Sequence, residues 1–183
     1  MSIKRAFVYV ADKTGLVKFT NELVAQDIEL YTFGSTQLYL KNHHIPHKPI
    51  KEILVEAEYD HLVQMDRYPD LTELITNIES PYHLDLIVAN FASMETLINN
   101  VRCQLWDVQF SIDTEISYLL RTAAKNYDRV IPIVLPSDYV DFMKVLINDK
   151  ITDVCRIKYA QKVFAHTSKY DSIVSQYMFP HTI

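Results

Sequence analysis

The chain has 183 residues, 49% of them hydrophobic, with 18 Lys and Arg against 23 Asp and Glu and a formal net charge of -5 at pH 7. This is the size and composition of a single globular domain, here residues 1–183, and the acidic balance argues against nucleic acid as a partner. Because no apolar run has the length of a signal peptide or a membrane span, and the two cysteines form no disulfide framework, we expect a cytoplasmic protein without a membrane partner.

Two strand–loop–helix units open the chain. Residues 6–10 form a short apolar strand pattern, and after a polar loop the apolar residues of 16–24 recur at helical spacing. The same order returns with a strand over 28–32, a loop over 33–36 and a helical pattern at 38–40. Two successive units of this kind predict a parallel sheet that is covered by helices.

The middle of the chain is less regular. A third strand is expected near Ile45, and residues 66–80 carry apolar positions at helical spacing. Residues 84–89 are mostly apolar and predict a buried strand that ends at Asn90. Residues 94–101 then have a helical pattern.

The next segments alternate extended and helical patterns. Residues 108–112 are expected to be extended, and residues 114–125 to form a helix capped by Asp113 or Thr114. Residues 130–135 predict a further strand, whose proline favours a sheet edge or a strand end.

The C-terminal third is predicted to be helical. Residues 136–138 open a helix that reaches about residue 148, and residues 152–178 keep a helical period, as one long helix or as a helix pair. The predicted fold class is therefore α/β, with a mostly parallel sheet, helices on both faces and a C-terminal helical segment.

Glycine is unusually rare. The chain has two, Gly15 and Gly34, where an average usage of about 7% would give roughly a dozen. Both fall in loops after predicted strands, where parallel α/β sheets bind ligands. The two loops supply an ammonium group and hydroxyl groups, from Lys13, Thr14, Ser35 and Thr36. They predict an anion-binding site at the starts of two helices. The alternative is that both loops are ordinary turns with capping residues.

Histidines and cysteines give no clear site. Residues 43–47 contain three histidines, but no further ligands stand at a recognised zinc spacing, so a solvated loop is favoured. His166 lies in the predicted C-terminal helix and is interpreted as a packed or capping residue. Cys103 and Cys155 lack the pattern of a nucleophile or a redox pair. No metal site is therefore predicted.

Three segments carry a resemblance to a known family. Residues 12–17 read DKTGLV, residues 120–126 read LRTAAKN and residues 163–171 read VFAHTSKYD. In order and spacing they resemble three blocks of the IMP cyclohydrolase domain of bifunctional purine biosynthesis enzymes. The resemblance implies a methylglyoxal-synthase-like fold, a homodimer and no metal or redox cofactor. It also implies a reaction in which the NH2 group of formyl-AICAR attacks its own formyl carbon and water leaves, giving IMP.

The resemblance also implies roles for individual residues. Asp113 would transfer protons, and Lys125 would polarise the formyl oxygen or orient the substrate. The implied substrate-binding residues are Lys13, Thr14, Gly34, Ser35, Thr36, Asn90, Arg67 and Asn126. An unbroken helix would separate Asp113 from Lys125 by about 18 Å, so the helix is interrupted or one residue comes from another side, such as a second protomer.

Several positions depart from the family pattern. Glycines of the family are replaced by Ser35, Glu115 and Ile116, its substrate-contacting tyrosine by Ala92, and a lysine position falls on Met65. Each lost polar contact would cost ~1–3 kcal/mol of binding free energy. The alternative function is therefore a catalytically degenerate domain that binds a phosphorylated nucleotide or metabolite in a regulatory role. Methylglyoxal synthase activity is a weaker third reading.

Overall fold

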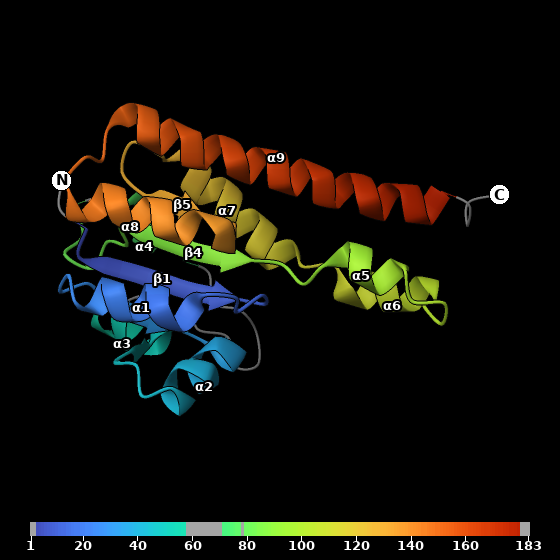
Figure 1. The fold of residues 1–183 in the computed structure, drawn as a ribbon, viewed down its shortest axis with the longest axis horizontal. Coiled ribbons are helices and arrows are strands. Elements are labelled where there is room, and N and C mark those ends of the chain that lie inside the picture. The colour runs from blue at the N-terminus through green and yellow to red at the C-terminus, as the bar shows by residue number, and fades with distance from the viewer. Residues whose placement is uncertain (1–2, 58–70, 78, 180–183) are drawn as a thin grey trace.

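The computed structural model of the chain describes residues 3–57, 71–77 and 79–179. Five parallel strands form one sheet in the order β3-β2-β1-β4-β5 (Figure 1). The strands are β1 (Arg5–Val10), β2 (Glu29–Thr32), β3 (Lys48–Pro49), β4 (Leu86–Asn90) and β5 (Ile131–Ile133). The predicted α/β class with a parallel sheet is confirmed.

The central strand is β1. Its residue Ala6 is opposite Leu30 of β2 on one side and Leu86 of β4 on the other. From β1 the chain moves outward to β2 and β3, and then returns to the other side of β1 for β4 and β5. The carboxyl ends of β1 and β4 therefore form the topological switch point, the place where open α/β sheets bind ligands.

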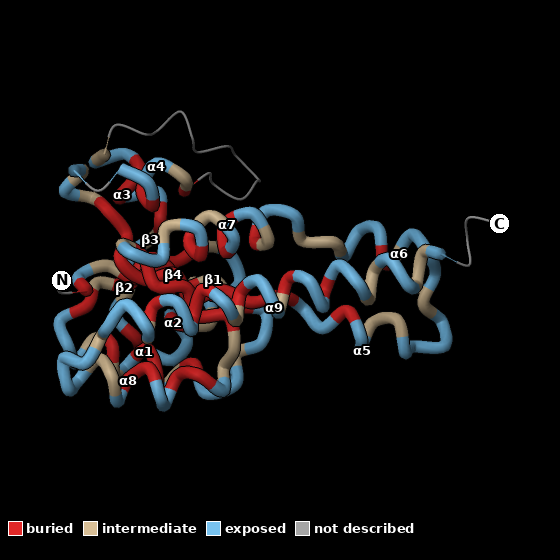
Figure 2. The backbone as a smooth tube through the Cα atoms, turned by 90° about the horizontal axis from the view of Figure 1, so that it is seen from above, coloured by how far each residue is buried: buried red, intermediate tan, exposed pale blue. Residues whose placement is uncertain are grey.

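Helices cover both faces of this sheet, as predicted. They are α1 (Leu16–Val24), α2 (Gly34–Asn42), α3 (Ile50–Glu56), α4 (Thr72–Thr76), α5 (Met94–Ile98), α6 (Leu105–Ser111), α7 (Thr114–Lys125), the 3-10 helix η2 (Pro136–Asp138), α8 (Tyr139–Ile147) and α9 (Asp153–Met178). Figure 2 shows α1 and α8 on one side of the strands, and α3, α4 and α7 on the other. Each side has its own core, one around Phe19 and Phe142 and the other around Leu54 and Leu120.

The longest helix, α9, extends beyond the sheet. Its 26 residues span about 39 Å at the usual helical rise. The Thr152 side chain caps its first turn by accepting a hydrogen bond from the Cys155 N–H. Beyond the carboxyl edge of the sheet, α9 runs beside α5 and α6 (Figure 1). The C-terminal segment is thus one helix and not a pair. Among the described residues, no helix is long and apolar enough to cross a membrane.

One predicted element has the wrong secondary structure. Residues 108–112 were expected to be extended, but Leu105–Ser111 form helix α6. A capping box explains the helix start, since the Gln104 side chain bonds to the N–H of Asp107 while the Asp107 carboxylate bonds to the N–H of Gln104. Within α6 only Val108 is buried, so the segment shows little of the periodicity that indicates a helix.

Other elements differ in their limits. The third strand, expected near Ile45, is the two-residue β3, which begins three residues further on; the Ile45 side chain is buried in the preceding loop. Within the predicted helix 66–80, only Thr72–Thr76 of the described residues form a helix, α4, and residues 66–70 and 78 lie outside the described residues. The strand with Pro132, β5, lies at the sheet edge as predicted.

Candidate functional site

Asn90, the last residue of β4, holds the loop that follows β1. Its Oδ1 accepts hydrogen bonds from the backbone N–H groups of Ala11 and Asp12, both at 2.8 Å. Its Nδ2 donates to the Asp12 carbonyl oxygen at 3.1 Å. The side chain is buried, so this predicted substrate-binding residue uses its amide to shape the switch point.

The two glycine loops meet around the end of β1. The Thr36 hydroxyl accepts a hydrogen bond from the Val10 N–H at 3.0 Å and donates to the Val10 carbonyl at 3.2 Å. The Lys13 ammonium donates to the same carbonyl at 3.2 Å and lies 5.7 Å from the centre of the Tyr39 ring. The structure therefore brings Lys13 and Thr36 together, but the buried Thr36 hydroxyl bonds to the backbone.

Three of the predicted substrate-binding residues lie on the surface of these loops, namely Thr14, Gly34 and Ser35. Gly34 begins α2 with a φ of 56°, a left-handed conformation that favours glycine. The first N–H groups of a helix have no partner within the helix, and they carry partial positive charge. With the nearby ammonium of Lys13, the start of α2 has the groups that an anion requires.

Asp113 lies at the start of α7, on the same edge of the sheet. Its carboxylate accepts a hydrogen bond from the Ile116 N–H at 2.9 Å, which confirms its predicted capping role. Its own N–H donates to the Tyr170 hydroxyl at 3.2 Å. Burial raises the pKa of the Asp113 carboxyl against the effect of the Ile116 hydrogen bond, and the Glu115 charge raises it further. A carboxyl of this kind exchanges protons closer to neutral pH, as general acid–base chemistry needs.

Tyr9 connects the starts of α2 and α7. An atom of its ring lies 3.5 Å from where a Cβ on Gly34 would stand. Burial raises the pKa of the Tyr9 phenol, and the charges of Asp113 and Glu115 raise it further. Tyr9 therefore lies within electrostatic range of Asp113. The sequence analysis gave this residue no role, because the contact depends on helices that follow β2 and precede β5.

Lys125 and Asn126 are not part of this group. Helix α7 runs unbroken for 12 residues from Thr114 to Lys125, so Asp113 and Lys125 stand about 18 Å apart at its two ends. Lys125 is exposed, and the Asn126 amide donates to the Thr122 carbonyl at 2.8 Å. Of the two alternatives, the interrupted helix is therefore excluded, and a residue that arrives from another side is left. Arg67 lies outside the described residues.

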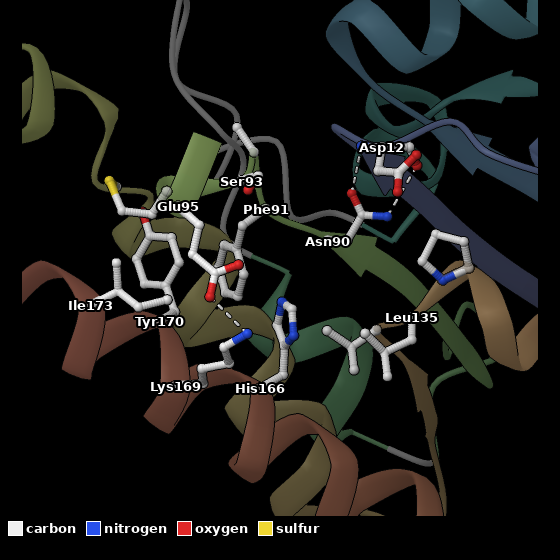
Figure 3. Close-up of a pocket in the computed structure, with 14 residues that line it drawn as sticks. Asp12, Asn90, Phe91, Ser93, Glu95, Leu135, His166, Lys169, Tyr170 and Ile173 are labelled. Atoms are coloured by element: carbon white, nitrogen blue, oxygen red, sulfur yellow. Dashed lines mark hydrogen bonds and ion pairs between the residues drawn. The ribbon is translucent and has the colours of Figure 1, made fainter. Parts of the chain in front are cut away.

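A cleft of about 400 Å³ lies between the end of β4 and the middle of α9 (Figure 3). It is lined by Asp12, Asn90, Phe91, Ala92, Ser93, Met94, Glu95, Val134, Leu135, Pro136, His166, Lys169, Tyr170 and Ile173. Its volume is in the usual range for small-molecule sites, and its walls are mainly apolar with a few polar groups. Of the predicted site residues that the structure describes, only Asn90 belongs to this lining.

His166 lines the cleft from α9 (Figure 3). Its ring stacks on Phe91, with centroids 5.4 Å apart and planes 5° apart. Phe91 in turn stacks on Tyr170 at 4.6 Å. Burial lowers the pKa of His166, and the Lys169 charge lowers it further, so the imidazole is neutral at pH 7. His166 is packed, as predicted, but it also faces a cleft, which the spacing of residues on α9 alone did not indicate.

An ion pair stands at one end of the cleft. The Lys169 ammonium lies 2.8 Å from the Glu95 carboxylate, and both side chains are more than half exposed. Such a pair contributes ~0–1 kcal/mol, so a ligand separates it at little cost. Asp12 stands toward the opposite end, beside Asn90 (Figure 3).

The histidine loop shows no metal centre. His43 and His47 each direct Nδ1 at a backbone carbonyl, that of Tyr39 at 2.8 Å and that of Ile45 at 2.7 Å. Across residues 3–57, 71–77 and 79–179, no group of three or more His, Cys, Asp or Glu is placed to hold a metal ion.

The strand order and the helices on both faces define a doubly wound α/β domain, with a cleft beside its switch point. Comparisons with known proteins agree with this fold. The family model described as "AICARFT/IMPCHase bienzyme" matches residues 123–182. The bifunctional purine biosynthesis protein PurH of Lactiplantibacillus plantarum is 33% identical over 96% of this chain, and that of Macrococcus caseolyticus is 29% identical over 98%. The chain is an IMP cyclohydrolase-like domain related to the purine biosynthesis proteins.

Two further comparisons define the extent of this likeness. The chain spans 37% and 39% of the lengths of these two PurH proteins. The crystal structure of ForH superposes with a TM-score of 0.76 and 20% identity, and the match covers 94% of this chain and 95% of that one. The likeness to ForH shows a shared fold, which agrees with the methylglyoxal-synthase-like α/β domain implied by the resemblance.

Proposed function

We propose that the chain binds formyl-AICAR and closes it to IMP. The observation that carries this proposal is the position of Asp113, a half-buried carboxyl with a raised pKa on the edge that also holds Lys13 and the start of α2. One end of this edge suits a phosphate group, and the other supplies a group able to exchange protons. A phosphorylated ligand that undergoes proton transfer fits both.

Ring closure forms one C–N bond and releases water. The NH2 nitrogen attacks the formyl carbon, and the formyl oxygen leaves as water with one hydrogen from each of the two nitrogens that flank that carbon. In this proposal Asp113 carries protons from nitrogen to the departing oxygen. Lys13 and Ser35 bind the phosphate group, which is distant from the reacting atoms. The two residues therefore orient the substrate and take no part in the bond changes.

Lys125 requires a second copy of the chain if it takes part. Since α7 holds it about 18 Å from Asp113, a lysine near the reacting atoms must come from a partner subunit. We therefore propose a homodimer in which α7 of one protomer supplies Asp113 and α7 of the other supplies Lys125. The location that fits this pathway is the cytoplasm.

Mixing two inactive variants tests this arrangement. Asp113→Asn and Lys125→Ala are each expected to abolish IMP formation, whereas Lys158→Ala, an exposed lysine on α9, serves as the control. If the site is shared in a symmetric dimer, a re-equilibrated mixture regains about a quarter of wild-type activity, since half the dimers are mixed and each has one intact site. A mixture that stays inactive contradicts the shared site.

A binding domain without catalysis is the second candidate. It is favoured by Ala92, Glu115 and Ile116, which stand where the resemblance places a tyrosine and two glycines. Calorimetry with IMP and AICAR separates the two functions. Micromolar binding without turnover of formyl-AICAR supports the second candidate, and absence of binding contradicts both.

A further inference from the structure

We propose that the cleft between β4 and α9 takes the planar heteroaromatic ring of the ligand, and that His166 forms hydrogen bonds with this ring. This inference rests on the proposed function for the identity of the ligand. It adds a recognition residue, His166, and a binding surface that shares only Asn90 with the described residues to which the resemblance gives a role.

The orientation of His166 is fixed by its neighbours. One face of its imidazole is covered by Phe91 in a nearly parallel stack, and Tyr170 covers the other face of Phe91. A stacked ring keeps its edge, which carries both nitrogens, available for hydrogen bonds. Within residues 3–57, 71–77 and 79–179, neither nitrogen of His166 has a hydrogen-bond partner, and Figure 3 shows the ring between Lys169 and Leu135 in the cleft. The face of the imidazole therefore packs in the fold, while its two nitrogens are available to a ligand.

The protonation state of His166 suits a heteroaromatic partner. Because burial and the Lys169 charge favour the neutral imidazole, one nitrogen donates a hydrogen bond and the other accepts one. The other charged or titratable groups that face the cleft are Asp12, Glu95 and Tyr170. A ring with adjacent donor and acceptor groups, as in a purine or an imidazole carboxamide, matches a neutral histidine better than a simple carboxylate or an ammonium ion does.

The walls and the position of the cleft agree with this ligand. Leu135, Pro136 and Ile173 supply apolar surface, and Ala92 adds a small side chain to the lining. The cleft also adjoins the proposed acid–base group, because the Tyr170 hydroxyl that accepts from the Asp113 N–H belongs to the same aromatic stack. The Phe91 and Tyr170 rings thus connect the cleft with the start of α7.

Binding measurements on the full chain test the assignment. His166→Gln is compared with His44→Asn, a substitution in the exposed histidine loop at a left-handed position that asparagine tolerates. The probes are IMP, AICAR and ribose 5-phosphate, the last of which has the phosphate but no base. We expect His166→Gln to weaken IMP and AICAR binding by about tenfold, the loss of one hydrogen-bonding group, and to change ribose 5-phosphate binding less than twofold. His44→Asn should leave all three affinities unchanged.

Histidine side-chain NMR on the wild-type chain gives a second measurement that needs no variant. The imidazole signals of His166 should shift on addition of IMP, while those of His43 and His44 stay in place. If IMP binds with no shift of His166 and equal affinity for His166→Gln, the cleft assignment is wrong and the proposed function stands. If neither IMP nor AICAR binds, both are wrong.

Discussion

The Asn90 side chain and the Asp12 backbone form a two-way hydrogen-bonded contact across 78 residues of sequence. Asn90 Oδ1 accepts from the Asp12 N–H at 2.8 Å, and Asn90 Nδ2 donates to the Asp12 carbonyl at 3.1 Å. This contact sets the shape of the β1–α1 loop at the switch point. The proposed phosphate end and the cleft therefore share one structural residue.

Replacement of Asn90 by leucine should destabilise the protein. The change leaves the N–H groups of Ala11 and Asp12 without their acceptor in a partly buried setting, at a cost of about 1–3 kcal/mol. Urea unfolding, monitored by circular dichroism, measures the free energy of unfolding. Asn100→Leu, which changes an exposed asparagine, is the control. A loss below about 0.5 kcal/mol would show that water replaces the amide without cost.

Thr36 and Ser35 should separate stability from ligand binding. Thr36→Val removes a buried hydroxyl that has both a donor and an acceptor contact with Val10, so we expect a loss of about 1–2 kcal/mol in unfolding free energy. Ser35→Ala changes an exposed residue and should leave stability within about 0.5 kcal/mol while weakening phosphate binding. Calorimetry with inorganic phosphate checks the second effect. The reverse pattern would place the phosphate at Thr36.

We expect that Gly34 is needed because its backbone is left-handed, and less because a side chain at this position would lack space. Its φ is 56°, and a Cβ there would meet the Tyr9 ring at an ordinary 3.5 Å. Gly34→Ala should therefore cost about 1–2 kcal/mol through the left-handed backbone, whereas Gly34→Asn should cost less. Thermal unfolding of the two variants measures the difference. Equal losses would indicate that the contact with Tyr9, and not φ, limits the position.

His83 should make stability depend on pH. Its side chain is buried, neither ring nitrogen has a hydrogen-bond partner among the described residues, and burial lowers its pKa below the usual 6.5 despite the charge of Asp85. The unfolded chain then binds a proton at a higher pH than the folded chain. The effect of His83 is therefore that the free energy of unfolding is highest above about pH 6.5 and falls as the pH decreases toward the folded-state pKa.

Comparison with His83→Leu isolates this effect. The apolar side chain has a similar size and no proton to bind, so the variant should lose less unfolding free energy than the wild type between pH 7.5 and 5. The expected difference is about 1.4 kcal/mol for each unit by which the folded-state pKa is lowered. Parallel pH profiles for the two proteins would mean that His83 is not buried as a neutral group.

The sequence predicted what depends on local patterns. The β1 and β2 units and the start of α7 at Asp113 follow from apolar spacing and capping residues, and the structure confirms them. The prediction for residues 108–112 was wrong because α6 buries a single side chain, so its sequence lacks the apolar spacing that indicates a helix. The cleft was missed because Phe91 and His166 meet only through the packing of α9, 75 positions further along the chain.

The rate of IMP formation from formyl-AICAR by the purified chain tests the central claim most directly. The account predicts a rate well above that in buffer, and a fall of at least about a hundredfold for Asp113→Asn, the usual size of a general acid–base contribution. Asp128→Asn, an exposed aspartate after α7, should keep the wild-type rate. A wild-type rate no faster than buffer, with IMP still bound, would contradict catalysis by this chain.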